Sequence, residues 1–76
     1  MITQRRLQHL LALVEHAHFG RAANALDISQ PALTKSIQAL ESELGVTLID
    51  RKHGAVGTTA FGELVIQRSK RMLTEE

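Results

Sequence analysis

Apolar residues recur with the period of an α-helix between residues 29 and 45 of the chain. Four of them are spaced by four, three and four positions: Leu33, Ile37, Leu40 and Leu44. Such spacing places side chains on one face of a helix. Ser29 before this run is a favourable N-cap residue, and Gly45 after it suits the left-handed backbone that ends many helices. The pattern predicts a helix over residues 29–44 with one buried face.

The opposite side of this predicted helix is polar. The residues on that side are Pro31, Thr34, Lys35, Gln38 and Ser42, and Gln30 lies at the exposed start of the helix. They offer hydrogen-bonding groups and one cation, whereas the acids Glu41 and Glu43 come only towards the far end. A face of this kind can lie against an anionic surface and recognise patterns of donors and acceptors. The sequence therefore favours a helix that binds the major groove of DNA.

A first helix is predicted from Thr3, which can cap it, to about Ala17. Its apolar face carries Leu7, Leu10, Leu11 and Val14, with Leu13 on the flank. Arg5 and Arg6 lie outside that face. Two interpretations of these arginines stay open, a solvated helix face and a contact with a DNA phosphate.

A second, short helix is predicted next. Four residues have the spacing of its buried face: Phe19, Ala22, Ala23 and Leu26. The two alanines are small enough to let another helix approach closely. Asp27 and Ile28 then form a tight turn, since aspartate tolerates a positive φ. Two helices joined by such a turn, the second with a polar outer face, indicate a helix-turn-helix motif.

The hydrophobic pattern changes after Gly45. Residues 46–49 and 56–58 are predicted to form two short strands, and the segment between them carries Arg51, Lys52 and His53. A basic hairpin directly after a helix-turn-helix indicates a wing, here at residues 51–55. A solvated hairpin tip is the alternative, mainly for His53.

A last helix, capped by Thr59 and reaching about Thr74, is predicted to carry two apolar stripes. We expect the first stripe to pack on the domain: Phe61, Leu64, Val65 and Met72. We expect the second stripe to form a dimer interface: Gly62, Ile66, Ser69 and Leu73. Because small residues permit close helix crossing, a second copy of the same helix is the expected partner. A frayed tail with scattered exposed leucines is the alternative.

The composition limits the possible functions. The chain has 76 residues and a net charge of +1, so DNA binding must depend on where the charges lie. It contains no cysteine, which excludes disulfides and thiol catalysis and is compatible with a reducing cytoplasm. No apolar run approaches the roughly 20 residues of a membrane span, and the N-terminus lacks the pattern of a signal peptide. We therefore expect a cytoplasmic protein.

The polar residues do not form a pattern typical of a catalytic or metal site. His9, His16 and His18 lack the spacing that usually brings zinc ligands together. The sequence also lacks an acid–base pair at a pocket-like spacing, a glycine-rich phosphate loop and a serine with a partnered base. We expect no metal, no cofactor and no enzymatic activity.

The segment from Phe19 to Arg51 resembles the N-terminal DNA-binding domain of LysR-type transcriptional regulators, and the resemblance covers nearly the whole chain. The shared features are Ala22, Ala23, Leu26, Ser29, Gln30, Pro31, Ala32, Ile37, Leu40, Glu41, Leu44, Gly45, Leu48, Arg51, Thr59 and Gly62. His18 stands where the family often has a capping serine, so we expect the second helix to be capped from elsewhere. The wing departs from the family at Ile49, Gly54 and Thr58, which suggests a less basic and less well-packed wing.

The resemblance implies a mainly α winged helix-turn-helix that ends in a long C-terminal linker helix. Residues 1–58 would form the DNA-binding domain, and residues 59–76 would form the linker helix that pairs two subunits. The family binds interrupted inverted repeats near promoters and responds to small molecules through a separate C-terminal domain. A small-molecule inducer is therefore expected only for a longer parent protein.

The helix pattern and the resemblance together predict the residues that contact DNA. The expected base contacts are Gln30, Pro31, Ala32, Thr34, Lys35 and Gln38, and the expected backbone contacts are Arg21, Ser29, Arg51, Lys52 and His53. Gln30 can address adenine, whereas Lys35 can reach either a guanine or a phosphate. The rival interpretation is a winged-helix module that binds a protein. Such a module should expose apolar anchors on the third helix, and this sequence places Gln, Thr and Lys there.

Overall fold

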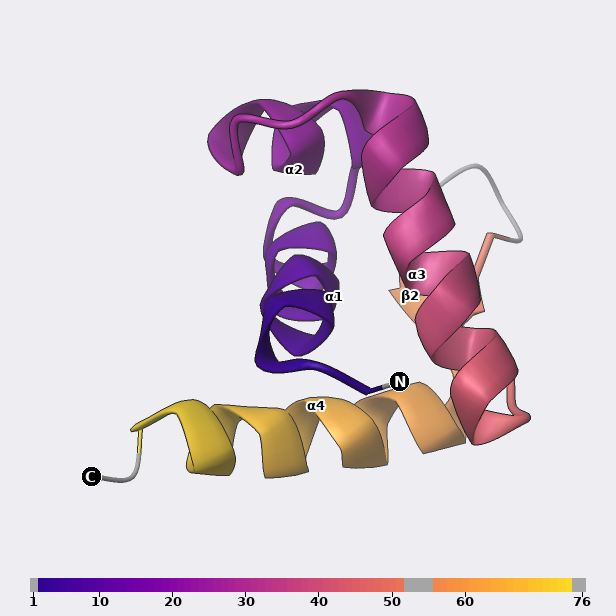
Figure 1. Ribbon diagram of the computed structural model, residues 1–76. Helices are drawn as coiled ribbons and strands as arrows, with labels where there is room; N and C mark the ends of the chain where they lie inside the picture. The colour runs from indigo at the N-terminus through magenta and orange to yellow at the C-terminus, as the bar shows by residue number, and fades with distance from the viewer. Residues whose placement is uncertain (1, 52–55, 75–76) are drawn as a thin grey trace.

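The computed structural model describes residues 2–51 and 56–74 of the chain. Within these residues the elements are α1 (Gln4–His16), α2 (Phe19–Ala25), α3 (Gln30–Leu44), β1 (Ile49–Asp50), β2 (Gly57–Thr58) and α4 (Ala60–Thr74). Figure 1 shows α1 in the middle of the molecule, with α3 along one side, α2 at one end and α4 crossing the other end. Helix α1 packs against the other three helices. This is the mainly α arrangement that the sequence predicts.

The helix ends follow from the residues at their caps. The Thr3 hydroxyl accepts a hydrogen bond from the Arg6 amide at 3.1 Å, which satisfies one free donor at the start of α1. Ser29 caps α3 in the same way, accepting from the Ala32 amide at 3.2 Å. Gly45 ends α3 with φ +71°, as predicted for a glycine in the left-handed region. The predicted bounds of α1 and α3 are thus confirmed to within a residue or two.

His18 caps α2, which corrects the prediction that this cap must come from elsewhere. Its Nδ1 accepts a hydrogen bond from the Arg21 amide at 3.1 Å. The backbone of His18 is extended, as is usual at an N-cap, so the ring can fold back over the first turn. Gly20 makes room for it, because a Cβ there would lie 3.0 Å from Cε1 of His18. The imidazole nitrogen thus takes the place of the serine hydroxyl that the family often has at this position.

The core is aliphatic and centres on α1 and α3. Leu33, Ile37 and Leu40 have no exposed surface, which confirms three residues of the predicted stripe of α3, and the fourth, Leu44, is half-buried. In α1 the buried residues are Leu7, Leu10 and Leu13, whereas Leu11 and Val14 are only half-buried. Leu13 is therefore a core residue and not a flanking one. Ala22 and Ala23 are buried as well, which lets α2 lie close to its neighbours.

The hairpin after α3 is shorter than predicted. Strands β1 and β2 pair antiparallel, with Ile49 opposite Thr58 and Asp50 opposite Gly57. Residues 46–48 stay outside the ladder, because the Leu48 amide donates to Oε2 of Glu41 at 2.7 Å and not to a strand partner. The predicted tip residues Lys52, His53 and Gly54 lie outside the described residues.

The two faces of α4 are reversed relative to the prediction. Ile66 and Ser69 are 3% and 2% exposed, and Gly62 is buried, all within a single chain. Phe61, Leu64 and Met72, which were expected to pack on the domain, are 59%, 49% and 64% exposed. Val65, the fourth residue of that stripe, is half-buried and packs against the core as predicted.

The physical cause of the reversal is a close approach between backbones. A Cβ on Gly62 would overlap the Leu48 carbonyl oxygen, so only glycine lets α4 come this near to the domain. The Thr59 hydroxyl accepts from the Gly62 amide at 3.0 Å and donates to the Thr47 carbonyl at 2.6 Å, which fixes the rotation of the helix. The assignment of Gly62, Ile66 and Ser69 to a dimer interface is therefore wrong. Leu73 is half-buried.

Candidate nucleic-acid interface

The outer face of α3 presents the residues predicted to contact bases. Gln30, Pro31, Ala32, Lys35 and Gln38 are exposed, and Thr34 is half-buried. Side chains three or four positions apart project from the same side of a helix, so these groups share one surface. That surface combines the amides of Gln30 and Gln38 with the small apolar groups of Pro31 and Ala32.

The junction of α2 and α3 holds Gln30 beside the cap of α2. The Oε1 atom of Gln30 would lie 3.5 Å from a Cβ on Gly20, and the His18 ring borders the same space. Arg21 is exposed in the first turn of α2, and Ser29 is exposed at the start of α3. The structure therefore places two of the predicted backbone contacts at the same end of the motif as Gln30.

The base of the wing is tied to α2. The guanidinium carbon of Arg51 lies 4.7 Å from the centre of the Phe19 ring, within the range of a cation–π contact. Arg51 is exposed, so this contact leaves its charge facing solvent. The other predicted wing contacts, Lys52 and His53, lie outside the described residues.

A groove between the start of α1 and the middle of α3 was not predicted. Its walls include Arg5, Arg6 and His9 from α1 and Ala32, Lys35 and Ser36 from α3. His9 Nδ1 and the Ser36 hydroxyl are 2.7 Å apart, which links the two helices across the floor of the groove. Burial of the ring, and secondarily the charge of Arg5, lower the pKa of His9 below its ordinary value. Sequence patterns could not find this pair, because its members are 27 positions apart.

Glu41 is a second residue whose role was not predicted. Its Oε2 accepts from the amides of Leu48 and Ile49 at 2.7 and 3.3 Å. The segment after α3 is thereby held against the helix, so that β1 begins at a fixed place. From the sequence alone, Glu41 could not be distinguished from Glu43, the other acid near the end of the polar face.

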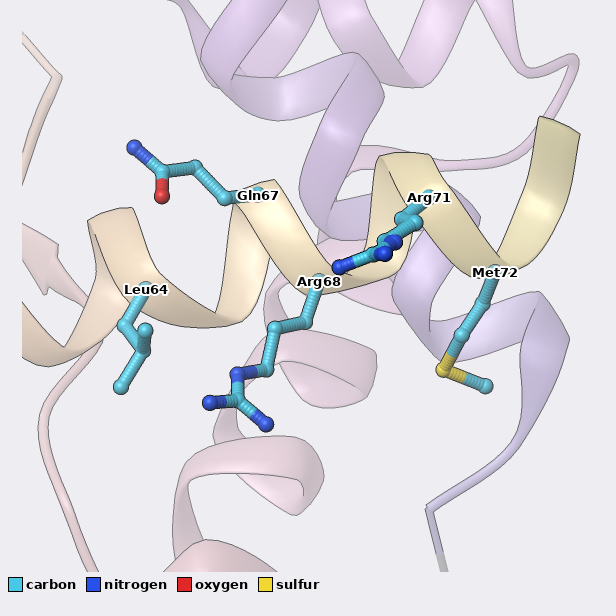
Figure 2. A pocket seen from close by; sticks show the side chains of 5 residues that line it. All are labelled: Leu64, Gln67, Arg68, Arg71 and Met72. Carbon is cyan, nitrogen blue, oxygen red and sulfur yellow. The ribbon is translucent and has the colours of Figure 1, made fainter. Parts of the chain in front are cut away.

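The outward side of α4 is apolar with basic residues among its apolar ones. Figure 2 shows Leu64, Arg68 and Met72 projecting from one side of the helix. These three residues, with Gln67 and Arg71, line a shallow hollow. Phe61 adds to the exposed apolar surface of the same helix.

The described residues contain no group of three or more His, Asp or Glu side chains placed to hold a metal ion. Among the same residues, no helix has the length and hydropathy needed to cross a membrane.

A sequence profile described as "Bacterial regulatory helix-turn-helix protein, lysR family" matches residues 4–63, from the start of α1 into α4. The chain belongs to the lysR family. Its match covers the helix-turn-helix DNA-binding region of these transcriptional regulators, a family of regulators and not of enzymes. The resemblance seen in the sequence is confirmed.

Individual lysR-family relatives match nearly the whole chain. It is 54% identical over 69 residues to the SDS degradation transcriptional activation protein of Pseudomonas sp. (strain ATCC 19151), covering 91% of this chain and 22% of that protein. It is 44% identical over 71 residues to the DNA-binding transcriptional dual regulator OxyR of Escherichia coli (strain K12), covering 93% and 23%. The chain thus spans less than a quarter of the length of these relatives.

Solved lysR-family structures confirm the fold. The BenM_DBD/catB site 1 DNA complex superposes with a TM-score of 0.92 at 38% identity, covering 96% of this chain and 81% of that one. The CbnR_DBD–DNA complex superposes with a TM-score of 0.89 at 36% identity, covering 95% and 83%. The predicted winged helix-turn-helix with a C-terminal linker helix is therefore correct.

Proposed function

We propose that this chain binds double-stranded DNA with sequence specificity, as a dimer on an interrupted inverted repeat, through α3 in the major groove. The observation that carries the proposal is the exposed polar face of α3, which bears hydrogen-bonding side chains and no acid between Gln30 and Gln38. Two solved relatives of the same fold are complexes with DNA, which supports this use of the fold.

The proposed base contacts follow from the chemistry of each side chain. Gln30 and Gln38 can each donate to and accept from one base edge, and an amide paired in this way suits adenine. Pro31 and Ala32 can touch a thymine methyl, and Thr34 can hydrogen bond to any of several bases. Lys35 can reach a guanine or a phosphate.

The proposed backbone contacts surround α3. Arg21 and Ser29 are exposed at its N-terminal end, and Arg51 is exposed at the base of the wing. The two arginine cations and the Ser29 hydroxyl would fix the position of the domain on the duplex without reading its sequence. Lys52 and His53 stay predictions for the same role.

The dimer is proposed to form through the exposed side of α4, in residues 59–76. Phe61, Leu64 and Met72 leave an apolar surface that the described part of the chain does not cover. The same side of a second α4 would cover it, and two copies related by a two-fold axis would match the symmetry of an inverted repeat. In a longer parent protein, a response to a small-molecule inducer would reside outside these 76 residues.

The test is selection of duplexes from a random library by the purified chain, followed by sequencing. Enrichment of an interrupted palindrome is the expected result. Enrichment of a single half-site would support sequence-specific binding by α3 but would contradict the proposed dimer. No enrichment over the input would contradict the proposed function and favour a module that binds protein.

Gln30→Ala tests whether Gln30 contacts a base and contributes to sequence preference. It should cost about 1–3 kcal/mol of binding at one base position and relax the sequence preference there. Gln8→Ala, at an exposed glutamine of α1, is the matched control and should leave that preference unchanged. Equal weakening of Gln30→Ala on every duplex would show that Gln30 does not read a base.

A further inference from the structure

The groove between α1 and α3 gathers positive charge beside the recognition helix. Arg5 is exposed on the α1 wall and Lys35 is exposed on the α3 wall, and Arg6 lines the groove as well. None of the described residues that line the groove is acidic. Like charges that share one groove repel each other, so a bound anion would stabilise this arrangement.

The lowered pKa of His9 agrees with a positively charged groove. The charge of Arg5 is one of the two causes that lower the pKa of His9, after burial of its ring. A neutral imidazole can keep its hydrogen bond to Ser36, which is 2.7 Å away, and so holds α1 against α3. The walls that carry Arg5 and Lys35 are therefore tied together by a polar contact at the floor.

The groove is continuous with the proposed DNA-binding face. Ala32 and Lys35 belong to both surfaces, since they line the groove and are exposed on the outer side of α3. When a helix lies in the major groove, phosphates flank it on both sides, because the groove is only about 12 Å wide. The start of α1 then lies beside α3 on the side of Lys35.

We propose that this groove binds a phosphate of the DNA backbone, with Arg5 from α1 and Lys35 from α3 as its two cations. The proposal rests on the proposed function and assigns Lys35 to the backbone and not to a guanine. Arg5 and Lys35 thereby position α3 in the major groove, and the bases are left to Gln30, Thr34 and Gln38.

The first experiment measures affinity for one selected duplex over a series of salt concentrations. Arg5→Ala and Lys35→Ala should each reduce the slope of log affinity against log salt by about 0.9, the value for one phosphate contact. Arg5→Lys keeps the charge and should retain the slope. Both residues are exposed, so the melting temperatures of the variants should match that of the unmodified chain.

The second experiment identifies the phosphate. Single phosphates of the duplex are replaced by neutral methylphosphonates, and the position at which Arg5→Ala no longer weakens binding is sought. One such position per half-site, shared with Lys35→Ala, is the expected result. If no position shows this coupling, the phosphate site is wrong.

Two further outcomes separate the failure of this proposal from that of the proposed function. An altered sequence preference in Lys35→Ala would show that Lys35 contacts a base, and would overturn the proposed phosphate site. A wild-type chain that binds its selected duplex while Arg5→Ala shows the same affinity and slope would overturn the site alone. A wild-type chain that binds no duplex would overturn the proposed function, and the site with it.

Discussion

Helices α3 and α4 have the same length, 15 residues, but they contact the core in opposite ways. α3 buries an unbroken apolar stripe and turns a polar face outward. α4 buries small residues around Ile66 and turns Phe61, Leu64 and Met72 outward. The outer face of α3 thus suits a polar, charged partner, whereas that of α4 suits an apolar one. One domain of this size can offer two kinds of surface because its helices differ in which side they bury.

The largest expected effect tests which side of α4 belongs to the core. Ile66→Ala should destabilise the fold by about 2–5 kcal/mol, because it leaves a cavity at a residue that is almost fully buried. Leu64→Ala, on the outer side, should change the stability of the monomer by no more than about 0.5 kcal/mol. Urea denaturation of both variants, at a protein concentration low enough to keep the chain monomeric, measures these two losses of stability. Equal losses would mean that the two sides of α4 do not differ as described.

Gly62→Ala tests the close approach that sets the rotation of α4. Alanine favours a helix over glycine by about 1 kcal/mol, so propensity alone predicts a gain in stability. The overlap of the new methyl with the Leu48 carbonyl oxygen should reverse this and give a net loss of about 1–3 kcal/mol.

The matched control is Gly57→Ala, where the nearest atom to a Cβ is the Asp50 carbonyl oxygen at an ordinary 3.7 Å. It should cost little, and thermal melts of both variants provide the comparison. A stabilised Gly62→Ala protein would show that α4 can move away from Leu48 without loss.

Glu41→Ala tests the contact that holds the segment after α3 against the helix. It removes the acceptor of the Leu48 and Ile49 amides, so two backbone donors lose their partner. The expected loss is about 1–3 kcal/mol in the free energy of unfolding. Glu15→Ala, at an exposed acid of α1, should stay within about 0.5 kcal/mol. If both variants lost the same small amount in denaturant titrations, the carboxylate of Glu41 would have no structural role.

The smallest expected effect is a dependence of stability on pH through His9. Its pKa in the folded chain is lower than the ordinary 6.5, so the unfolded chain takes up this proton at a higher pH. The stability linked to His9 is therefore complete above about pH 6.5 and is lost as the pH falls through the lowered pKa. In His9→Gln this part of the pH dependence should vanish from denaturation curves recorded across that range. Identical pH profiles for the two proteins would contradict the assignment.

The sequence was sufficient to predict a helix where the capping residues and the apolar spacing allowed only one interpretation. Ser29, Gly45 and a single apolar stripe define α3 without reference to any other element, and Thr3 and Thr59 similarly predict the starts of α1 and α4. The residues of the outer face of α3 could be predicted for the same reason, since the exposed side of α3 is the side opposite its stripe.

The remaining features depend on contacts between distant residues. α4 carries two apolar stripes, and the choice between them is made by Gly62 against Leu48, which no helical period reveals. His9 and Ser36 meet only because α1 crosses α3, and Glu41 binds amides of the segment beyond its own helix. His18 was misjudged because an imidazole nitrogen can accept a hydrogen bond as a serine hydroxyl does.

The contact between Gly62 and Leu48 lies near the N-terminal end of α4, so it influences the direction in which the rest of the helix extends. α4 extends about 22 Å at 1.5 Å per residue, so a rotation of about 10° at this end displaces the other end by about 4 Å. That displacement is close to the roughly 3.4 Å between successive base pairs. In a symmetric pair joined through α4, the distance between the two copies of α3 follows from this angle. A single missing side chain, remote from the DNA, would then determine the number of base pairs between the half-sites.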